Sequence, residues 1–306
     1  MASVSGGELA GAVSAAGGLG FIGVGHATET RWIAEQAELA RPGGKFGIGL
    51  MAWAMERRPE LLEAMLATGP AAVSVSFGDP APHVGAIREA GAVAIAQVHD
   101  GASARRAVEA GIGVLVAQGS EAGGHSGAEV GTLPLLQVVL EIVDAAGLPV
   151  LAAGGVGTGR ALAGVLAMGA AGAWIGTRFA ATHEALGKVA AKRRILEADE
   201  TQTVLTRIFD ITQDIPWPPR FPGRALENAF VERWHGREQE LRARRETASS
   251  GLAEARAAED FSEMYVYAGQ ASGVVHDLPA AGELVARMAT EAERALGDAC
   301  HRWLRH

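Results

Sequence analysis

The first 180 residues alternate between short, continuous apolar runs and longer amphipathic segments. The apolar runs predict seven strands, at 20–25, 45–51, 71–77, 92–98, 113–119, 149–155 and 172–177. Because the runs are continuous, they are typical of parallel strands buried on both faces. The segments between them are rich in Ala, Leu and Glu and predict helices, at 30–40, 59–67, 101–110, 131–146 and 159–168. This regular alternation favours an α/β fold, a TIM (β/α)8-type barrel.

The strand count is one short of the eight that a barrel requires. The segment 7–17 reads as a helix, and no predicted strand precedes it. We therefore expect a barrel that lacks its first strand. An artificial chain boundary, a misjudged start codon and a truly incomplete barrel all remain open explanations. An open sheet would expose the edge of the strand at 20–25, which favours unwanted pairing.

The character of the chain changes after about residue 190. Residues 191–260 are polar and charged, with a Pro-rich break at 215–223 and a helix–turn–helix pattern at 232–260. The segment 279–296 predicts an amphipathic helix. We expect three parts: a cofactor-binding barrel at 1–190, a helical lid or insertion at 191–262, and a C-terminal segment at 263–306 that packs back on the barrel.

Composition excludes several classes of function. The net charge of −8 argues against a nucleic-acid or anionic-membrane partner, which would favour a basic surface. With Cys300 as the single cysteine, no internal disulfide forms. No apolar run reaches the length of a membrane span, and the start of the chain lacks the pattern of a signal peptide, which favours the cytoplasm.

One loop combines an ionisable ring with very little side-chain bulk. The stretch VAQGSEAGGHSG, residues 116–127, begins at the end of the fifth predicted strand and contains His125 among glycines. Barrel enzymes build their active sites at the carboxyl ends of the strands. Glycines let the backbone approach a flat ligand, and a neutral imidazole accepts a proton near neutral pH. We interpret His125 as a catalytic base, against the alternative of a histidine that caps a turn.

The last two predicted strands also end in glycines. Gly154 and Gly155 end the sixth strand, and Gly176 and Thr177 end the seventh. In a barrel that lacks its first strand these are the seventh and eighth loops, the usual phosphate site of the fold. Backbone N–H groups near a helix start, with the Thr177 hydroxyl, would suit an anion. Tight turns also favour paired glycines, so a purely structural role remains open.

Other polar residues give weaker signals. His26 and His83 lie in predicted loops on the same side as His125, and His99 follows a strand end. The sequence contains no HExxH or CxxC motif, so no metal site is expected. The segment LMAWAM at 50–55 could line an apolar acyl pocket or belong to the core.

The motif AQGSEAGGHSG, together with PVLAAGGVGTGRALAGVLAMGAAGAWIGTRFAAT, resembles the nitronate monooxygenase family. The segments ELAGAVSAAGGLGFIGVG and YAGQASGVVHDLPAAGELV are similar to the N- and C-terminal parts of that family. The resemblance implies an FMN-dependent TIM barrel that oxidises alkyl nitronates with O2 to a carbonyl compound and nitrite. It assigns His125 as the base. It implies flavin contacts at Gln118 and Gly123, and phosphate contacts at Gly154, Gly155, Trp174, Ile175, Gly176 and Thr177.

The chain departs from the family pattern at two places. Gly49 stands where many members carry an asparagine that contacts the flavin. The second departure is the start, where Met1 resembles the methionine of an Ala-Pro-Met-like turn that ends the family's first strand. This agrees with the strand count and makes a truncated, non-catalytic homologue one alternative.

Two further alternatives share the barrel. Flavin-dependent enoyl-acyl-carrier-protein reductases carry the same EAGGH motif and use NAD(P)H. A flavin-free aldolase or isomerase is disfavoured, because no lysine or carboxylate pair stands at a predicted strand end. The expected partners are a nitronate or nitroalkane and O2, and a homodimer is left open.

Overall fold

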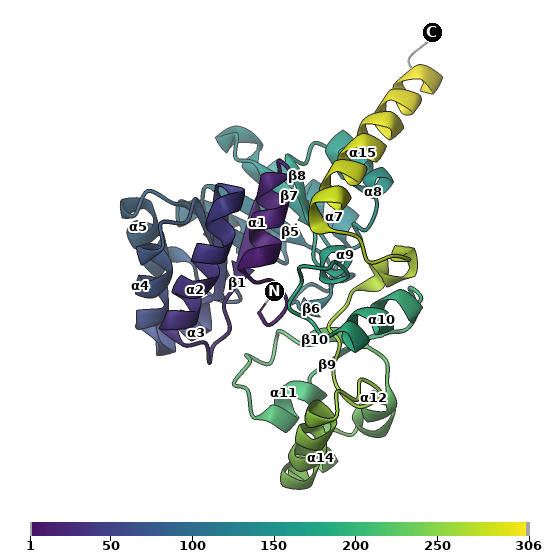
Figure 1. Ribbon diagram of the computed structural model, residues 1–306. Helices are drawn as coiled ribbons and strands as arrows, with labels where there is room; N and C mark the ends of the chain where they lie inside the picture. The colour runs from purple at the N-terminus through teal and green to yellow at the C-terminus, as the bar shows by residue number, and fades with distance from the viewer. Residues whose placement is uncertain (1, 304–306) are drawn as a thin grey trace.

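The computed structural model describes residues 2–303, and its centre is a curled sheet of seven parallel strands. The strands are paired in the order β1-β2-β3-β4-β5-β7-β8 (Figure 1). They span Gly20–Gly23, Phe46–Met51, Ala72–Ser76, Val93–Val98, Val114–Gln118, Val150–Ala153 and Gly172–Trp174. All seven predicted strands are therefore confirmed, and the architecture is that of a TIM-type barrel that is open between β1 and β8.

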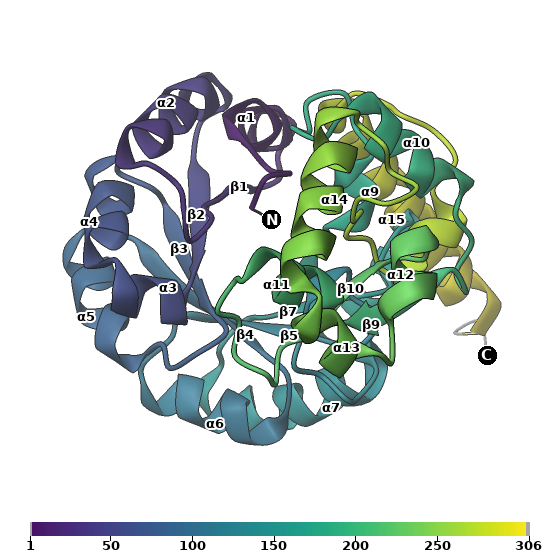
Figure 2. The same cartoon turned by 90° about the horizontal axis from the view of Figure 1, so that it is seen from below.

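Helices follow the strands and surround the sheet in a ring (Figure 2). The long ones are α1 Gly7–Ala15, α2 Thr30–Ala40, α4 Pro59–Ala67, α5 Ala81–Glu89, α6 Gly101–Glu109, α7 Thr132–Val143 and α8 Gly159–Ala167. The short helix α3, Ala52–Arg57, precedes α4. The C-terminal helix α15, Ala281–Trp303, packs on α8, as its amphipathic pattern predicts. His83, expected in a loop, lies instead in α5, because the helix begins two residues before it.

The two faces of the strands carry different residues. Outward positions such as Ile22, Ile48 and Leu115 pack under the helices in the main core. Inward positions form a smaller apolar layer, which includes Ile95 and Val116. Towards the carboxyl ends the alternation places small or polar residues inside the barrel, among them Gly49, Ser74 and Gln118. The barrel is thus filled at its base and has little side-chain bulk at its mouth.

The outer edge of β1 is covered in part by the N-terminal segment. The Gly23 N–H donates to the Ser5 carbonyl over 2.9 Å, and the Ser5 hydroxyl donates to the Phe21 carbonyl. The neighbouring Val4 carbonyl accepts from the Leu186 N–H over 2.9 Å. Val4 and Ser5 therefore connect the edge of β1, which was predicted to be exposed, to Leu186 on the other side of the barrel opening. Met1, which the family resemblance singles out, lies outside the described residues.

A second, three-stranded antiparallel sheet lies over the barrel mouth. Its order is β6-β10-β9, formed by Gly124–His125, Gly223–Leu226 and Thr203–Thr206. The sequence pattern did not predict it, because strands of two to four residues carry too little periodicity. Register pairs Gly223 with His125 and with Thr206. This sheet joins the motif loop of the barrel to the polar part of the chain.

The polar part of the chain has a hydrophobic core of its own, centred on Phe209, Phe230, Trp234 and Leu252. Its helices are α11 Ile208–Gln213, α12 Ala229–Trp234, α13 Glu238–Ala243 and α14 Arg245–Ala257. The helices α9 Thr177–Ala180 and α10 Val189–Glu197 precede them and contribute Ala180 and Ile195 to a separate apolar cluster. The segment 232–260, predicted as helix, turn and helix, contains the end of α12 and the whole of α13 and α14. They stand beside the barrel opening (Figure 2). The division at 191–262 stays a prediction, although the separate core is consistent with it.

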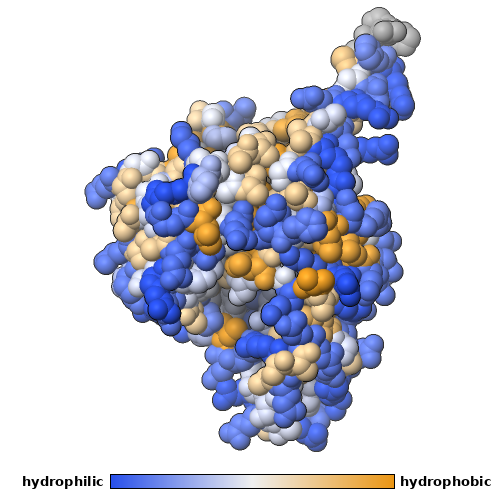
Figure 3. Space-filling model, in the orientation of Figure 1, coloured by the Kyte–Doolittle hydropathy of each residue, from blue (hydrophilic) through white to orange (hydrophobic). Residues whose placement is uncertain are grey.

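The surface is largely hydrophilic on the face drawn in Figure 3, with apolar groups scattered between the charged ones. Within residues 2–303, no helix combines the length and apolar character needed to cross a membrane.

Candidate active site

His125 lies at the mouth of the barrel, in the loop that follows β5, and is the second residue of β6. Its Nε2 atom is 3.0 Å from Oδ1 and 3.0 Å from Oδ2 of Asp210, on α11. The two side chains are 9% and 3% exposed. Because a carboxylate only accepts, Nε2 carries a proton and Nδ1 is the basic nitrogen of the neutral ring. No residue of the range 2–303 bonds to Nδ1, so it is available to take a proton.

Aromatic rings enclose the imidazole of His125. The indole of Trp217 stacks on it with a centroid distance of 3.6 Å and an interplanar angle of 7°. The ring of Tyr267 is tilted against it at 5.3 Å. Burial, and secondarily the Asp210 carboxylate, raise the pKa of Tyr267 well above its ordinary value. Tyr267 is therefore neutral at physiological pH and contributes a ring and a hydroxyl, not a charge.

Gln118 connects the motif loop to the neighbouring strand. Its Oε1 accepts from Nε2 of His99 over 2.7 Å, and its Nε2 donates to the His125 carbonyl over 3.3 Å. Burial lowers the pKa of His99, against the opposing effect of the Gln118 bond, so His99 is neutral. His99 thus orients Gln118, and Gln118 has one N–H left for a ligand.

The glycine and glutamate of the motif have structural partners. The Glu121 carboxylate accepts from the Thr132 N–H at the start of α7, over 2.9 and 3.0 Å. A Cβ on Gly123 would lie 2.5 Å from the Gly269 nitrogen, so only glycine fits at this contact between two backbones. These contacts hold the loop in place, and a flavin contact at Gly123 remains a prediction.

Gly154 and Gly155 adopt consecutive positive φ angles, +102° and +72°. This turn exposes the backbone of Gly155, where an added Cβ would have only Glu121 as a neighbour, at 3.9 Å. The Gly155 N–H donates to no acceptor among residues 2–303. The start of α8, by contrast, is already occupied, because the Gly159 N–H donates to the Glu291 carboxylate over 3.1 Å. The Gly159 N–H is therefore not available to an anion, and a contribution of this helix terminus stays a prediction.

The residues after β8 contribute mainly backbone. Trp174 faces the barrel interior beside Phe21, at 4.3 Å between ring centroids, and Ile175 packs in the outer core. Gly176 has open space where a Cβ would be. The Thr177 hydroxyl accepts from the Gly269 N–H over 2.9 Å and still has its own proton to donate. Gly155 and Gly176 thus have open space beside the backbone, and Thr177 has a hydroxyl proton to donate, which are features that suit a phosphate.

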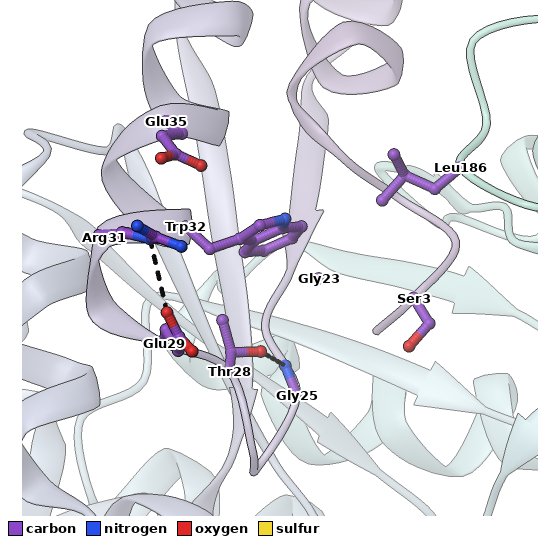
Figure 4. A pocket seen from close by; sticks show the side chains of 9 residues that line it. All are labelled: Ser3, Gly23, Gly25, Thr28, Glu29, Arg31, Trp32, Glu35 and Leu186. Carbon is purple, nitrogen blue, oxygen red and sulfur yellow. Dashed lines mark hydrogen bonds and ion pairs between the residues drawn. The ribbon is translucent and has the colours of Figure 1, made fainter.

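A pocket of about 450 Å³ opens at the edge of β1 rather than beside His125. Ser3, Gly23, Gly25 and Leu186 lie around it, with Trp32 on α2 (Figure 4). The Gly25 N–H donates to Thr28 Oγ1 over 2.9 Å at its lower rim. It adjoins the N-terminal segment and holds none of the predicted site residues.

Sequence reasoning missed Asp210, Trp217 and Tyr267. Asp210 is 85 residues from His125, and no motif marks it. Trp217 lies in the Pro-rich segment 215–223, which sequence reasoning treated only as a break. An aromatic residue between prolines was the available signal, because a stiff segment can hold a ring against a ligand.

Comparisons with known proteins identify the family and the fold. The family model described as nitronate monooxygenase matches residues 51–291. A (3aS,4S,5R,7aS)-5-hydroxy-7a-methyl-1-oxo-octahydro-1H-indene-4-carboxyl-CoA dehydrogenase of Mycobacterium tuberculosis is 34% identical over 76% of the chain. The match covers 63% of that relative's length.

Solved structures cover almost the whole chain. Nitroalkane oxidase from Streptomyces ansochromogenes is 31% identical, with a TM-score of 0.81 over 98% of this chain and 95% of that one. FabK from Thermotoga maritima is 27% identical, with a TM-score of 0.85 over 98% and 93%. Since the family model covers well over half of the residues, this chain belongs to the nitronate monooxygenase family.

Proposed function

We propose that the protein is an FMN-dependent nitronate monooxygenase, which oxidises alkyl nitronates with O2 to a carbonyl compound and nitrite. The observation that carries the proposal is the His125–Asp210 pair at the barrel mouth, 3.0 Å apart, with Nδ1 of His125 bonded to none of the residues 2–303. Family membership and the likeness to a nitroalkane oxidase support it.

The residues of the mouth fit FMN. Gly155, Gly176 and Thr177 offer neutral donors with open approach for the phosphate, and the glycine turn at Gly154 shapes that loop. Small or polar inward residues, Gly49 and Gln118 among them, leave room for a flat ring system. When bound, FMN would supply the redox chemistry, accepting electrons from the substrate and passing them to O2.

The roles of the other predicted cofactor residues follow from their placement. Trp174 and Ile175 would contribute backbone groups, and Gly123, which admits the Gly269 backbone on one side, would do the same from the motif loop. Because Gly49 has no side chain that could contact the flavin ring system, Gln118 would make that contact. The second N–H of its side-chain amide would donate to the ring system.

His125 would act on substrates that arrive as neutral nitroalkanes. Its Nδ1 takes the proton from the carbon next to the nitro group, and Nε2–H stays bonded to Asp210. The carboxylate fixes the tautomer and stabilises the imidazolium that results. A substrate that arrives as the anionic nitronate does not need this step. Enclosure by Trp217 and Tyr267 keeps water away from the ring.

The proposal also covers the compartment and the partners of the enzyme. We place it in the cytoplasm, with a small nitro compound and O2 as its partners and without nucleic acid or membrane. A homodimer is the assembly to test by light scattering.

The decisive experiment combines a spectrum with turnover. The purified chain should bind FMN and consume O2 with nitronate. His125→Ala should keep FMN and lose turnover of neutral nitroalkanes by about 100- to 10,000-fold, the usual contribution of a general base. A chain that binds FMN but consumes no O2 with any nitronate would refute the proposal, and one that refuses FMN would favour the non-catalytic alternative.

A reductase or dehydrogenase acting on a thioester is the second candidate. The observation that favours it is the 34% identity to a carboxyl-CoA dehydrogenase. An apolar side chain cluster that includes Trp53 also lies at the mouth. Steady oxidation of NADH in the presence of an enoyl thioester, with no response to nitronates, would decide for the reductase.

A further inference from the structure

A buried ion pair adjoins the loop that follows β8. Arg178, the second residue of α9, is only 3% exposed. Its guanidinium donates to the carboxylate of Asp277 and, over 3.2 Å, to the carbonyl of the same residue. Asp277 is 99 residues further along the chain, in the linker between the 3-10 helix Gln270–Val274 and α15. The pair therefore joins the start of α9 to the C-terminal segment, beside which α9 lies (Figure 1).

The Arg178 guanidinium already has an anion as its partner. Its Nη1 donates to the carbonyls of Asp277 and Ala181, over 3.2 and 3.5 Å, and its Nη2 donates to the Asp277 carboxylate. Burial lowers the pKa of Arg178, and the Asp277 carboxylate opposes that effect, so the group stays charged. A buried charge is costly without its partner, so α9 keeps the orientation in which Arg178 reaches Asp277.

Asp277 is itself held in place by α15 and by the linker. Arg287 on α15 donates to both oxygens of its carboxylate, over 2.7 and 3.3 Å. The hydrogen bond from Arg287 is the main cause that lowers the pKa of the Asp277 carboxyl, which is therefore ionised at neutral pH. The linker also bonds to the loop after α9, because the His183 N–H donates to the Pro279 carbonyl over 3.1 Å. The carboxylate is thus a fixed point against which α9 is oriented.

Thr177 immediately precedes Arg178 and begins the same helix. Its hydroxyl accepts from the Gly269 N–H over 2.9 Å, which leaves the hydroxyl proton for another acceptor. The helix α9 has only 4 residues, about one turn, so a displacement of Arg178 also displaces Thr177. The direction in which the Thr177 hydroxyl donates therefore depends on the anchor that Asp277 provides.

We propose that Asp277 is a positioning residue for the FMN phosphate: by holding Arg178, it directs the Thr177 hydroxyl towards that group. This rests on the proposed function and names a further residue on which its cofactor site depends. Asp277 itself touches neither FMN nor substrate, and Arg178 serves the helix rather than the phosphate. The flavin ring system is assigned to Gln118, on β5, so its binding does not depend on the pair.

The test compares the dissociation constants of FMN and riboflavin, which differ only in the phosphate, by fluorescence titration of the full chain. Asp277→Asn keeps the shape of the side chain and loses its charge. We expect it to weaken FMN binding about fivefold, part of what one hydrogen bond to a charged group contributes. Riboflavin should bind equally well to the variant and to the parent chain. Thr177→Val, which removes the hydroxyl, should weaken FMN binding about tenfold and also leave riboflavin unaffected.

A double variant and a matched control complete the design. In the Thr177→Val background, Asp277→Asn should add little further loss of FMN affinity, because both changes act on the same hydroxyl. Asp298→Asn is the control, since it removes an equal charge from α15 at a side chain that is 59% exposed and pairs only with Arg294, over 3.9 Å. If Asp277→Asn does not fold, Asp277→Glu keeps the charge but shifts it by one methylene, and the same selective loss of FMN affinity is expected.

The outcomes separate this proposal from the proposed function. Equal losses of FMN and riboflavin affinity in Asp277→Asn would indicate a general structural role and overturn the positioning role. Tighter FMN binding would overturn it too, because Arg178, once released, would then bind the phosphate itself. Selective loss of FMN affinity in a chain that turns over no nitronate would refute the proposed function alone. A chain that binds neither flavin would refute both.

Discussion

Nε2 of His125 lies 3.0 Å from both carboxylate oxygens of Asp210, although the two residues are 85 positions apart and belong to different parts of the chain. The pair connects the barrel to the polar part of the chain at the place where chemistry is expected. Its consequence is a fixed tautomer, with Nδ1 as the only basic nitrogen.

Asp210→Asn should therefore impair proton abstraction specifically. An amide can turn its NH2 towards the ring and select the opposite tautomer, which removes the base from Nδ1. We expect kcat/KM for neutral nitroethane to fall by roughly 10- to 100-fold. Turnover of the preformed nitronate should change little. Oxygen consumption with each form of the substrate measures this.

The control for that substitution is Asp214→Asn. Asp214 follows on the same segment, but its side chain is 77% exposed and pairs with Arg245 at the surface. Exposed pairs contribute little, so activity should stay unchanged. Equal losses with both forms of the substrate in Asp210→Asn would contradict the tautomer role.

Gly155→Ala should weaken FMN binding. A methyl group at this position enters the open approach to the Gly155 N–H, and φ of +72° disfavours any Cβ. We expect the dissociation constant to rise about tenfold, read from flavin fluorescence. Gly147→Ala is a matched control, because Gly147 also has a positive φ, +61°, and free space, but lies at the far end of α7. If both variants bind FMN equally, Gly155 does not contact it.

Trp217→Ala should loosen the site. The indole loses its stacking on His125 and its edge contacts with Trp53 and Phe77. We expect the free energy of unfolding to fall by about 1–3 kcal/mol, from urea denaturation, and Trp217→Phe to recover most of it. A full loss of stability in the Phe variant would show that ring stacking is not the cause.

Stability should fall as the pH drops below the ordinary pKa of histidine, about 6.5. Burial lowers the pKa of His99, and also those of His26 and His83. Between the folded and unfolded pKa values the unfolded chain binds more protons, so acid favours unfolding, and above that window these groups have no effect. His99→Gln should flatten this dependence in urea denaturation at about pH 7, 6 and 5. An unchanged slope would mean that His99 is not buried neutral.

Much of the barrel could be predicted, because its information is local. Continuous apolar runs such as 92–98 and 113–119 are long enough to show strands buried on both faces, and they appear as β4 and β5. The glycines at 154 and 155 predicted a special turn, and both have positive φ. The motif around His125 indicated the family, which the match over residues 51–291 confirms.

The tertiary structure alone decided the partners of those residues. Asp210 reaches His125 only because β6 and β10 pair across nearly a hundred residues, and such short strands leave no periodic signal. Likewise, Ser5 covers the edge of β1 through single backbone contacts that no residue type announces. The sequence by itself determined the barrel and the glycine-rich motif that contains His125, since both follow from local pattern. Only folding determined which carboxylate and which rings surround that histidine, because those contacts depend on long-range packing.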